Sequence, residues 1–163
     1  MARWTCHLFY LTEAMEHSVV QWNMRGFQAN FEELALLSRR FRPAVFGLQE
    51  TLLTNSKSPS FSGFSILTKN SPNDRTTGGV ALLINNSCLL NEVHLNTPLQ
   101  VVAARVTLNK VVTFCSIYLH PLDLVAKTDL INLTEELPSL FVLLGDFSSH
   151  CPVWGNESCN IRG

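Results

Sequence analysis

Short apolar runs, separated by polar and turn-forming residues, are the main pattern along this chain and predict β-strands. They cover residues 19–23, 44–48, 64–68, 80–84, 101–108, 111–119 and 141–144. The run at 141–144 has no polar alternation, which is typical of a strand buried on both faces. The runs at 101–108 and 111–119 flank the polar pair Asn109-Lys110, so we expect them to form a hairpin.

Apolar residues at helical spacing follow Asn30 and Pro121 and predict a helix in each place. We expect Asn30 to be the N-cap of the first helix, with Glu33 completing a capping box. Pro43 ends that helix because a proline disfavours the α conformation at the residue before it. The order strand, helix, strand in residues 18–48 then predicts a parallel pair of strands.

The composition indicates one ordered globular domain, with 163 residues, 46% hydrophobic residues and 15% charged residues. We interpret residues 1–17 as a loosely ordered leader and residues 18–163 as the domain. The net charge of -1 gives no overall electrostatic argument for nucleic-acid binding. A dense basic cluster, Arg39-Arg40-Phe41-Arg42, is explained equally well as the solvated end of a helix.

The five cysteines are odd in number and no pair has C-x-x-C spacing, so neither a disulfide framework nor a zinc site is indicated. This favours a nuclear or cytoplasmic protein, because residues 1–17 also lack the features of a secretory signal. No apolar stretch approaches membrane-spanning length, and we expect no membrane partner. The composition says nothing about the oligomeric state.

Polar side chains follow four of the predicted strands, and they are Asn23, Glu50, Tyr118 and Asp146. Each has a structural interpretation by itself: a turn cap, a solvated loop acid, a core aromatic and a Gly-Asp turn. Together they offer hard oxygen ligands of the kind that Mg²⁺ prefers. Such an ion can neutralise a phosphodiester and stabilise its leaving oxygen, so the set predicts a metal-dependent phosphoesterase site.

A set of local strings in a fixed order resembles the endonuclease/exonuclease/phosphatase family. The strings are Gln21-Trp22-Asn23-Met24-Arg25-Gly26, Leu48-Gln49-Glu50-Thr51, Gly78-Gly79-Val80-Ala81, Ser116-Ile117-Tyr118-Leu119-His120-Pro121 and Gly145-Asp146-Phe147-Ser148-Ser149-His150. Within that family the chain is most similar to the apurinic-type endonuclease domain of non-LTR (LINE-like) retrotransposons. The run Pro152-Val153-Trp154-Gly155 and the run Asn160-Ile161-Arg162-Gly163 are also typical of that branch.

The resemblance implies an α/β fold, a two-sheet sandwich with its active site at one rim. It implies that Glu50 is the metal ligand, for Mg²⁺ or Mn²⁺, and that Asn23 lies beside the metal. It also implies that Tyr118 contacts the phosphate or helps the leaving group, and that Asp146 orients or deprotonates the attacking water. Ser148 stands where the family has an asparagine that donates to the phosphate, and a hydroxyl is shorter than an amide.

The family pattern continues to a Ser-Asp-His string that this sequence does not contain. We therefore expect a domain that is incomplete at its C-terminus, with impaired hydrolysis. The leading hypothesis is a DNA-nicking retrotransposon endonuclease domain, with a reverse transcriptase downstream in the intact polyprotein. A non-catalytic retroelement remnant is the second hypothesis, and a phosphoesterase for lipid or inositol phosphates is the third.

Overall fold

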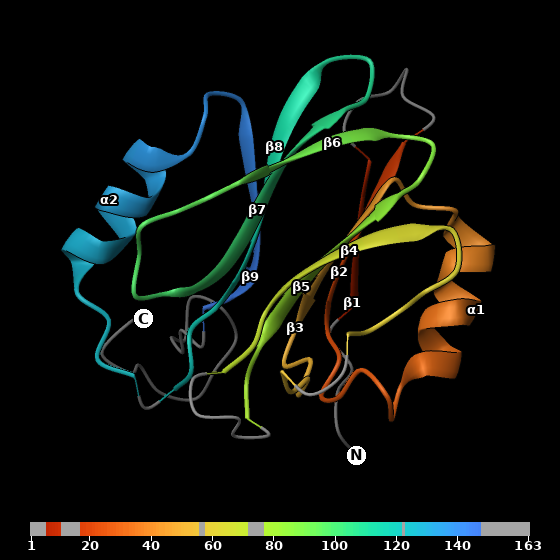
Figure 1. Cartoon of the computed structure of the whole chain (residues 1–163), viewed down its shortest axis with the longest axis horizontal. Coiled ribbons are helices and arrows are strands. Elements are labelled where there is room, and N and C mark those ends of the chain that lie inside the picture. The colour runs from red at the N-terminus through yellow and green to blue at the C-terminus, as the bar shows by residue number, and fades with distance from the viewer. Residues whose placement is uncertain (1–5, 11–16, 56–57, 72–76, 122, 148–163) are drawn as a thin grey trace.

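The computed structural model describes residues 6–10, 17–55, 58–71, 77–121 and 123–147 as two β-sheets and two helices (Figure 1). The first sheet has the order β1-β2-β3-β5-β4, and its strands are β1 (Cys6–Tyr10), β2 (Ser18–Asn23), β3 (Val45–Gln49), β5 (Val80–Asn85) and β4 (Phe64–Lys69). The second sheet has the order β6-β7-β8-β9, with β6 (Leu89–Val93), β7 (Gln100–Thr107), β8 (Val111–Tyr118) and β9 (Phe141–Asp146). The helices are α1 (Phe31–Phe41) and α2 (Lys127–Glu136).

The pairing of the strands confirms the predicted parallel pair and the predicted hairpin. The strands β2 and β3 are parallel, with Asn23 opposite Gln49. The strands β7 and β8 are antiparallel around Asn109-Lys110. The strands β8 and β9 are again parallel, with Tyr118 opposite Asp146. Because parallel strands end at the same edge of a sheet, this topology gathers the carboxyl ends of β2, β3, β8 and β9.

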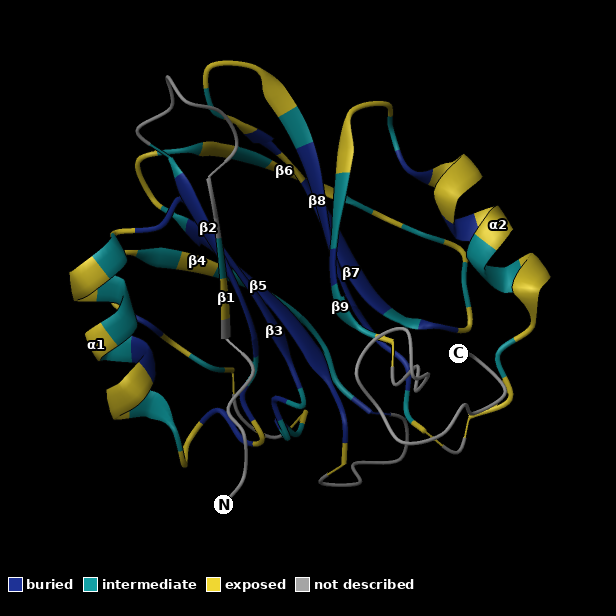
Figure 2. Ribbon diagram, turned by 180° about the vertical axis from the view of Figure 1, so that it is seen from behind, coloured by how far each residue is buried: buried dark blue, intermediate teal, exposed yellow. Residues whose placement is uncertain are grey.

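The four layers follow the order helix, sheet, sheet, helix, and an apolar core fills each space between them. Leu34 of α1 packs on the outer face of the first sheet, with Val20 and Phe46. Between the sheets, Leu82 and Phe114 belong to a central core. Leu133 of α2 packs on the outer face of the second sheet. Figure 2 shows the consequence, since the middle strands are buried along most of their length. Apolar sequence without alternation is what such doubly covered strands require.

Two local expectations need correction. Asn30 is the N-cap residue of α1 as predicted, but its side chain makes no cap hydrogen bond, so the predicted capping box with Glu33 is wrong. The amide of Asn30 instead donates to the carbonyl oxygens of Met24 at 2.7 Å and Gly26 at 3.3 Å, which holds the loop that follows β2. The strand β9 is less covered than expected, because among the described strands it lies at the edge of its sheet.

The strands β1 and β6 were not expected from the apolar pattern. The strand β1 pairs with β2 and lies within the segment that the sequence analysis interprets as a leader. The strand β6, with the sequence Leu-Leu-Asn-Glu-Val, is short and largely exposed, so its apolar signal is weak. The boundary between leader and domain stays a prediction. No helix in the described part of the chain is long and apolar enough to cross a membrane.

Candidate active site

The four residues singled out from the sequence meet at one rim of the two sheets. Asn23 is the last residue of β2, and Glu50 follows β3 directly. Tyr118 and Asp146 are the last residues of β8 and β9. The parallel pair β2–β3 of the first sheet and the parallel pair β8–β9 of the second sheet therefore each place two of these residues at the rim. The two sets of residues face each other across it.

The amide of Asn23 joins the two carboxylates across the sheets. Its Nδ2 atom donates to Oε1 of Glu50 at 2.8 Å and to Oδ2 of Asp146 at 2.7 Å. One half-buried amide thus holds two acids that would otherwise repel each other at close range. Its Oδ1 atom is buried and has no hydrogen-bond partner among the described residues. An orphaned buried oxygen beside two carboxylates is a suitable donor for a cation.

Tyr118 completes this cluster as a neutral phenol. Its side chain is buried, with only 4% of its surface exposed. Burial raises its pKa well above 10.0, and the acceptor carboxylate of Glu50 and the charges of Asp146 and Asp123 raise it further. The hydroxyl therefore keeps its proton near neutral pH and donates to Glu50. A phenol held in this way is available as a hydrogen-bond donor to a developing negative charge.

The backbone at Glu50 lies in the left-handed region, with φ of 50°. This conformation is costly for a residue other than glycine and is common at functional sites. Hydrogen bonds hold it from both sides: the N–H of Gly26 donates to the carbonyl of Glu50 at 2.7 Å, and the N–H of Thr51 donates to the carbonyl of Gly79 at 3.2 Å. The strand β3 is therefore turned sharply at its exit, and this turn aims Glu50 at the rim.

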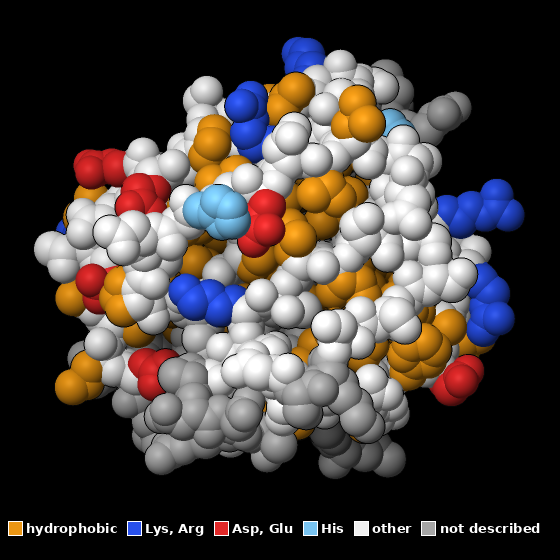
Figure 3. Space-filling view, in the orientation of Figure 1, with side chains coloured by type: hydrophobic (Ala, Val, Ile, Leu, Met, Phe, Trp, Pro, Cys, Tyr) orange, Lys and Arg blue, Asp and Glu red, His pale blue; other side chains and the backbone are white. Residues whose placement is uncertain are grey.

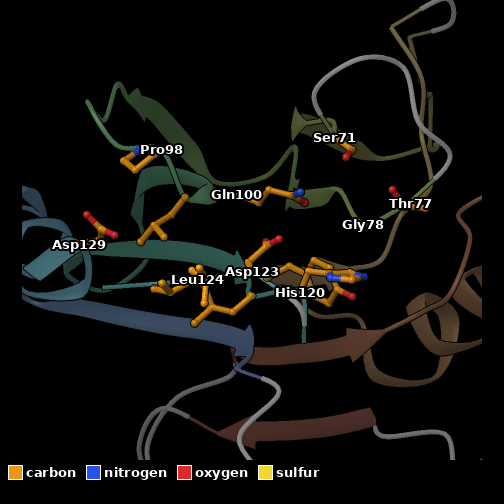
Figure 4. A pocket seen from close by; sticks show the side chains of 13 residues that line it. Ser71, Thr77, Gly78, Pro98, Gln100, His120, Asp123, Leu124 and Asp129 are labelled. Carbon is orange, nitrogen blue, oxygen red and sulfur yellow. The ribbon is translucent and has the colours of Figure 1, made fainter. Parts of the chain in front are cut away.

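A cavity of about 710 Å³ opens beside Tyr118. It lies between the segment before β5 and the segment that runs from β8 to α2, and Figure 4 shows Gln100, His120 and Asp123 around it. Tyr118 forms part of its wall, whereas Asn23, Glu50 and Asp146 do not line it. The cavity therefore adjoins the carboxylate cluster and offers space for a substrate that reaches Tyr118.

Sequence analysis missed Gln100, which fixes the mouth of this cavity. Its Oε1 atom accepts from the N–H of Gly79 at 2.8 Å, and Gly78 lies against the ring of Tyr118. A side chain at Gly78 would stand 3.2 Å from Cε1 of Tyr118, and the φ of +70° also favours glycine. The predicted hairpin did not reveal this, because a two-residue turn at Asn109-Lys110 would pair Gln100 with Leu119, whereas the loop has three residues and Gln100 lies opposite Tyr118.

The residues present fit a hard divalent cation. Two carboxylates, an amide oxygen and a phenol are oxygen donors, and Mg²⁺ is commonly bound through one or two carboxylates plus water. Within the described residues, no group of three or more His, Cys, Asp or Glu side chains gathers to hold a metal ion. Ser148, the fifth predicted site residue, lies outside the described residues.

The face of the molecule seen in Figure 3 carries charged side chains of both signs. In Figure 3, the Lys and Arg side chains on the visible face are scattered and form no continuous patch. Acidic side chains lie among them on the same face. This agrees with the net charge of -1.

Comparisons with known proteins agree with the arrangement of the strands. No family model matches the chain. The chain is 28% identical over 155 residues to a probable RNA-directed DNA polymerase from transposon X-element of Drosophila melanogaster, a match that covers 89% of this chain and 16% of that protein. It therefore spans about a sixth of the length of that relative.

Solved structures share the fold at low sequence identity. The endonuclease domain of TRAS1, a telomere-specific non-LTR retrotransposon, superposes with a TM-score of 0.69 at 19% identity, over 90% of this chain and 66% of that one. The 3′ phosphatase NExo from Neisseria, solved with a product DNA hairpin, has a TM-score of 0.61 at 21% identity, over 80% of this chain and 57% of that one. The chain has the two-sheet fold of the endonuclease/exonuclease/phosphatase family and resembles the endonuclease domains of non-LTR retrotransposons.

Proposed function

We propose that this chain is a DNA-nicking nuclease domain of a retroelement polyprotein, which hydrolyses phosphodiester bonds with the help of Mg²⁺ or Mn²⁺. The observation that carries the proposal is the Asn23 amide, which bridges Glu50 and Asp146 from the ends of two sheets. Such a pair of acids can divide two tasks, one toward a cation and the other toward water. We further propose that the protein acts in the nucleus or cytoplasm, beside a reverse transcriptase of the same polyprotein.

Each residue has a task that follows from its place. Glu50 would hold the cation, which supplies charge neutralisation at the phosphate when it is bound. Asp146 would orient a water molecule and accept its proton, because its carboxylate is fixed by the Asn23 amide. Tyr118 would donate to a phosphate oxygen, since its phenol stays protonated. Ser148 would contribute a further donor, as the residue at the family's asparagine position.

The substrate class follows from both the site and the relatives. NExo was solved with a DNA hairpin, and the Drosophila relative is named as an RNA-directed DNA polymerase. We therefore propose DNA as the substrate, and a lipid or inositol phosphate as the competing one. A non-catalytic retroelement remnant is the other alternative.

The proposal is tested by nicking of supercoiled DNA. The 163-residue chain would be compared with a form fused to the part of a TRAS1-type endonuclease domain beyond the structural match. We expect the fused form to nick with Mg²⁺ or Mn²⁺ and the 163-residue chain to be much weaker. Glu50→Gln should remove the metal-dependent nicking, while Glu32→Gln, which neutralises an exposed carboxylate on α1, should not.

The expected loss for Glu50→Gln is at least about 100-fold, because the variant removes a charged ligand at nearly constant shape. Wild-type nicking by Glu50→Gln would show that the cation is held elsewhere. Hydrolysis of a phosphoinositide in place of DNA, with the same dependence on Glu50, would move the assignment to the lipid alternative. Inactivity of every form toward both substrates would favour the remnant.

A further inference from the structure

A buried glutamine directly below the rim connects four strands of the two sheets. Gln49, the last residue of β3, has no exposed surface. Its Oε1 atom accepts from Nε2 of Gln21 on β2 at 2.6 Å. Its Nε2 atom donates to Oγ of Ser116 on β8 at 3.0 Å and to the carbonyl of Leu144 on β9 at 3.1 Å. One side chain therefore contacts the three other strands that carry the site.

Each hydrogen-bond partner of Gln49 lies two positions before a site residue on the same strand. Gln21 precedes Asn23 by two positions, Ser116 precedes Tyr118 by two, and Leu144 precedes Asp146 by two, while Gln49 precedes Glu50. Side chains two residues apart on a strand point to the same face. The hydrogen bonds of Gln49 therefore fix how far the four strands are shifted along their axes relative to one another, just before the residues of the catalytic cluster.

A third hydrogen bond joins the sheets at this level. The hydroxyl of Ser116 donates to the carbonyl of Leu48 at 3.1 Å, so β8 is tied to the backbone of β3 as well as to the Gln49 amide. These polar groups lie among apolar side chains of the central core, such as Val80 and Tyr118. Burial of an amide is unfavourable unless its groups are satisfied, and an aliphatic side chain would pack there without that requirement. A satisfied hydrogen-bond network in this place favours one position of the sheets relative to each other, here called the offset, over shifted alternatives.

We propose that Gln49 is a positioning residue, which fixes the offset between the sheets so that Glu50 and Asp146 both reach the Asn23 amide and Tyr118 reaches Glu50. Without it, either sheet could slide or tilt by a fraction of an ångström while the apolar core remained closed. The catalytic consequence of this role depends on the proposed function. Its geometric part does not, because it concerns the position of Tyr118 relative to Glu50.

The geometric part is tested by ¹⁹F NMR on the 163-residue chain labelled with 3-fluorotyrosine. The sequence contains two tyrosines, Tyr10 and Tyr118, so two resonances are expected and Tyr118→Phe assigns them. Glu50→Gln changes the hydrogen-bond acceptor of Tyr118, so this variant shows in which direction the Tyr118 resonance moves when that hydrogen bond is perturbed. We expect Gln49→Leu to move and broaden the Tyr118 resonance in the same direction, with the chain still folded by circular dichroism and urea titration.

Ser116→Ala is the milder variant, should Gln49→Leu fail to fold. It removes the hydroxyl contact but keeps the bond from Gln49 to Leu144, and we expect a smaller shift in the same direction. Thr113→Val is the matched control, because Thr113 is buried on the same strand and its hydroxyl has no partner among the described residues. It should leave the Tyr118 resonance in place.

The outcome that would overturn the proposal is a Tyr118 resonance that stays unshifted in Gln49→Leu or Ser116→Ala while the urea midpoint falls. The network would then be structural only. A shift in Thr113→Val as large as in Ser116→Ala would also overturn it, since any change on β8 would then disturb Tyr118.

Mg²⁺ alone, titrated into the same samples, separates this proposal from the proposed function. If the wild-type Tyr118 resonance responds to Mg²⁺, Gln49→Leu should raise the Mg²⁺ concentration at the midpoint of that response by about tenfold or more. Losses of this size are typical when a residue that orients a metal ligand is replaced.

In the fused form, Gln49→Leu should lower kcat for nicking by about 10–100-fold and leave KM for DNA little changed. A wild-type resonance that ignores Mg²⁺ would count against the metal role of Glu50 and leave the NMR result on Gln49 standing. An unchanged Mg²⁺ midpoint and kcat in a variant whose Tyr118 has shifted would overturn the catalytic half of the proposal.

Discussion

At the scale of single residues, Asn23 has a role that its type makes possible. The amide nitrogen offers two hydrogens, and the structure uses them for Glu50 and Asp146. No acidic or aliphatic side chain could replace it, since an acid adds a third negative charge and an aliphatic group leaves two acids facing each other. The identity of this residue therefore sets both the geometry and the charge of the rim.

The variant Asn23→Asp should be less stable than Asn23→Ala at pH 7. Both lose the two hydrogen bonds, at a cost of about 1–3 kcal/mol, but only the aspartate adds like-charge repulsion. Urea unfolding of the two variants at pH 7, at low and at high salt, measures this difference, and salt should reduce it by screening the repulsion. An equal loss of stability in both variants at both salt concentrations would show that the three groups are not close in solution.

At the scale of elements, the approach of the two sheets depends on a glycine. Gly47 lies in the middle of β3, and a Cβ atom there would stand 2.6 Å from Cβ and 2.7 Å from Cδ1 of Leu144 on β9. Real Cβ atoms do not approach a neighbour so closely. The backbone of β3 can therefore lie close to β9, and this closeness allows Gln49 to reach the carbonyl of Leu144 at 3.1 Å.

Gly47→Ala should lower the free energy of unfolding by about 1–3 kcal/mol, because the added methyl group overpacks the space between the sheets. Leu144→Ala removes Cγ and Cδ1, which are among the atoms that the new Cβ would meet. In a double-mutant cycle by urea titration, Gly47→Ala should therefore cost less in the Leu144→Ala background than in the wild type. Strict additivity would contradict this prediction and would mean that Cγ and Cδ1 of Leu144 do not contribute to the cost of Gly47→Ala.

At the scale of the whole molecule, three apolar cores stabilise the layers, and a thiol lies in the one beneath α2. Cys115 has no exposed surface and packs with Ile117 and Leu133. Burial raises its pKa from 9.0 to about 12. The fold therefore favours the neutral thiol, whereas the unfolded chain ionises first as pH rises. Its contribution to stability is complete below about pH 9 and is lost between about pH 9 and pH 12.

The free energy of unfolding should thus decline above pH 9, and this one thiol accounts for up to about 1.4 kcal/mol per pH unit of the slope. Cys115→Ala should flatten the decline between pH 9 and pH 11, even though its stability at pH 7 is lower through the lost packing. Urea titrations over this pH range compare the two proteins. Cys88→Ala, at a half-buried thiol, is the matched control and should leave the slope nearly unchanged. A slope that Cys115→Ala does not alter would assign the alkaline loss to other groups.

The sequence by itself determined the elements whose physical signal is local. Doubly covered strands such as β3 and β5 must be apolar throughout, and the helices repeat apolar residues on one face, so both could be predicted. The site candidates Asn23, Glu50, Tyr118 and Asp146 could be found because polar groups that follow buried strands are conspicuous. Their catalytic roles are not fixed by this pattern and stay predictions.

Only the tertiary structure decided how these parts relate to one another. The strand β6 was missed because an exposed strand has little apolar signal. The capping box at Asn30 was predicted wrongly because the Asn30 amide donates to the preceding loop. The roles of Gln49, Gln100 and Gly47 could not be anticipated, since each depends on a partner between 21 and 97 positions away. Contacts across that separation are set by sheet packing, and a linear pattern of apolar and polar residues does not encode which strand ends face each other.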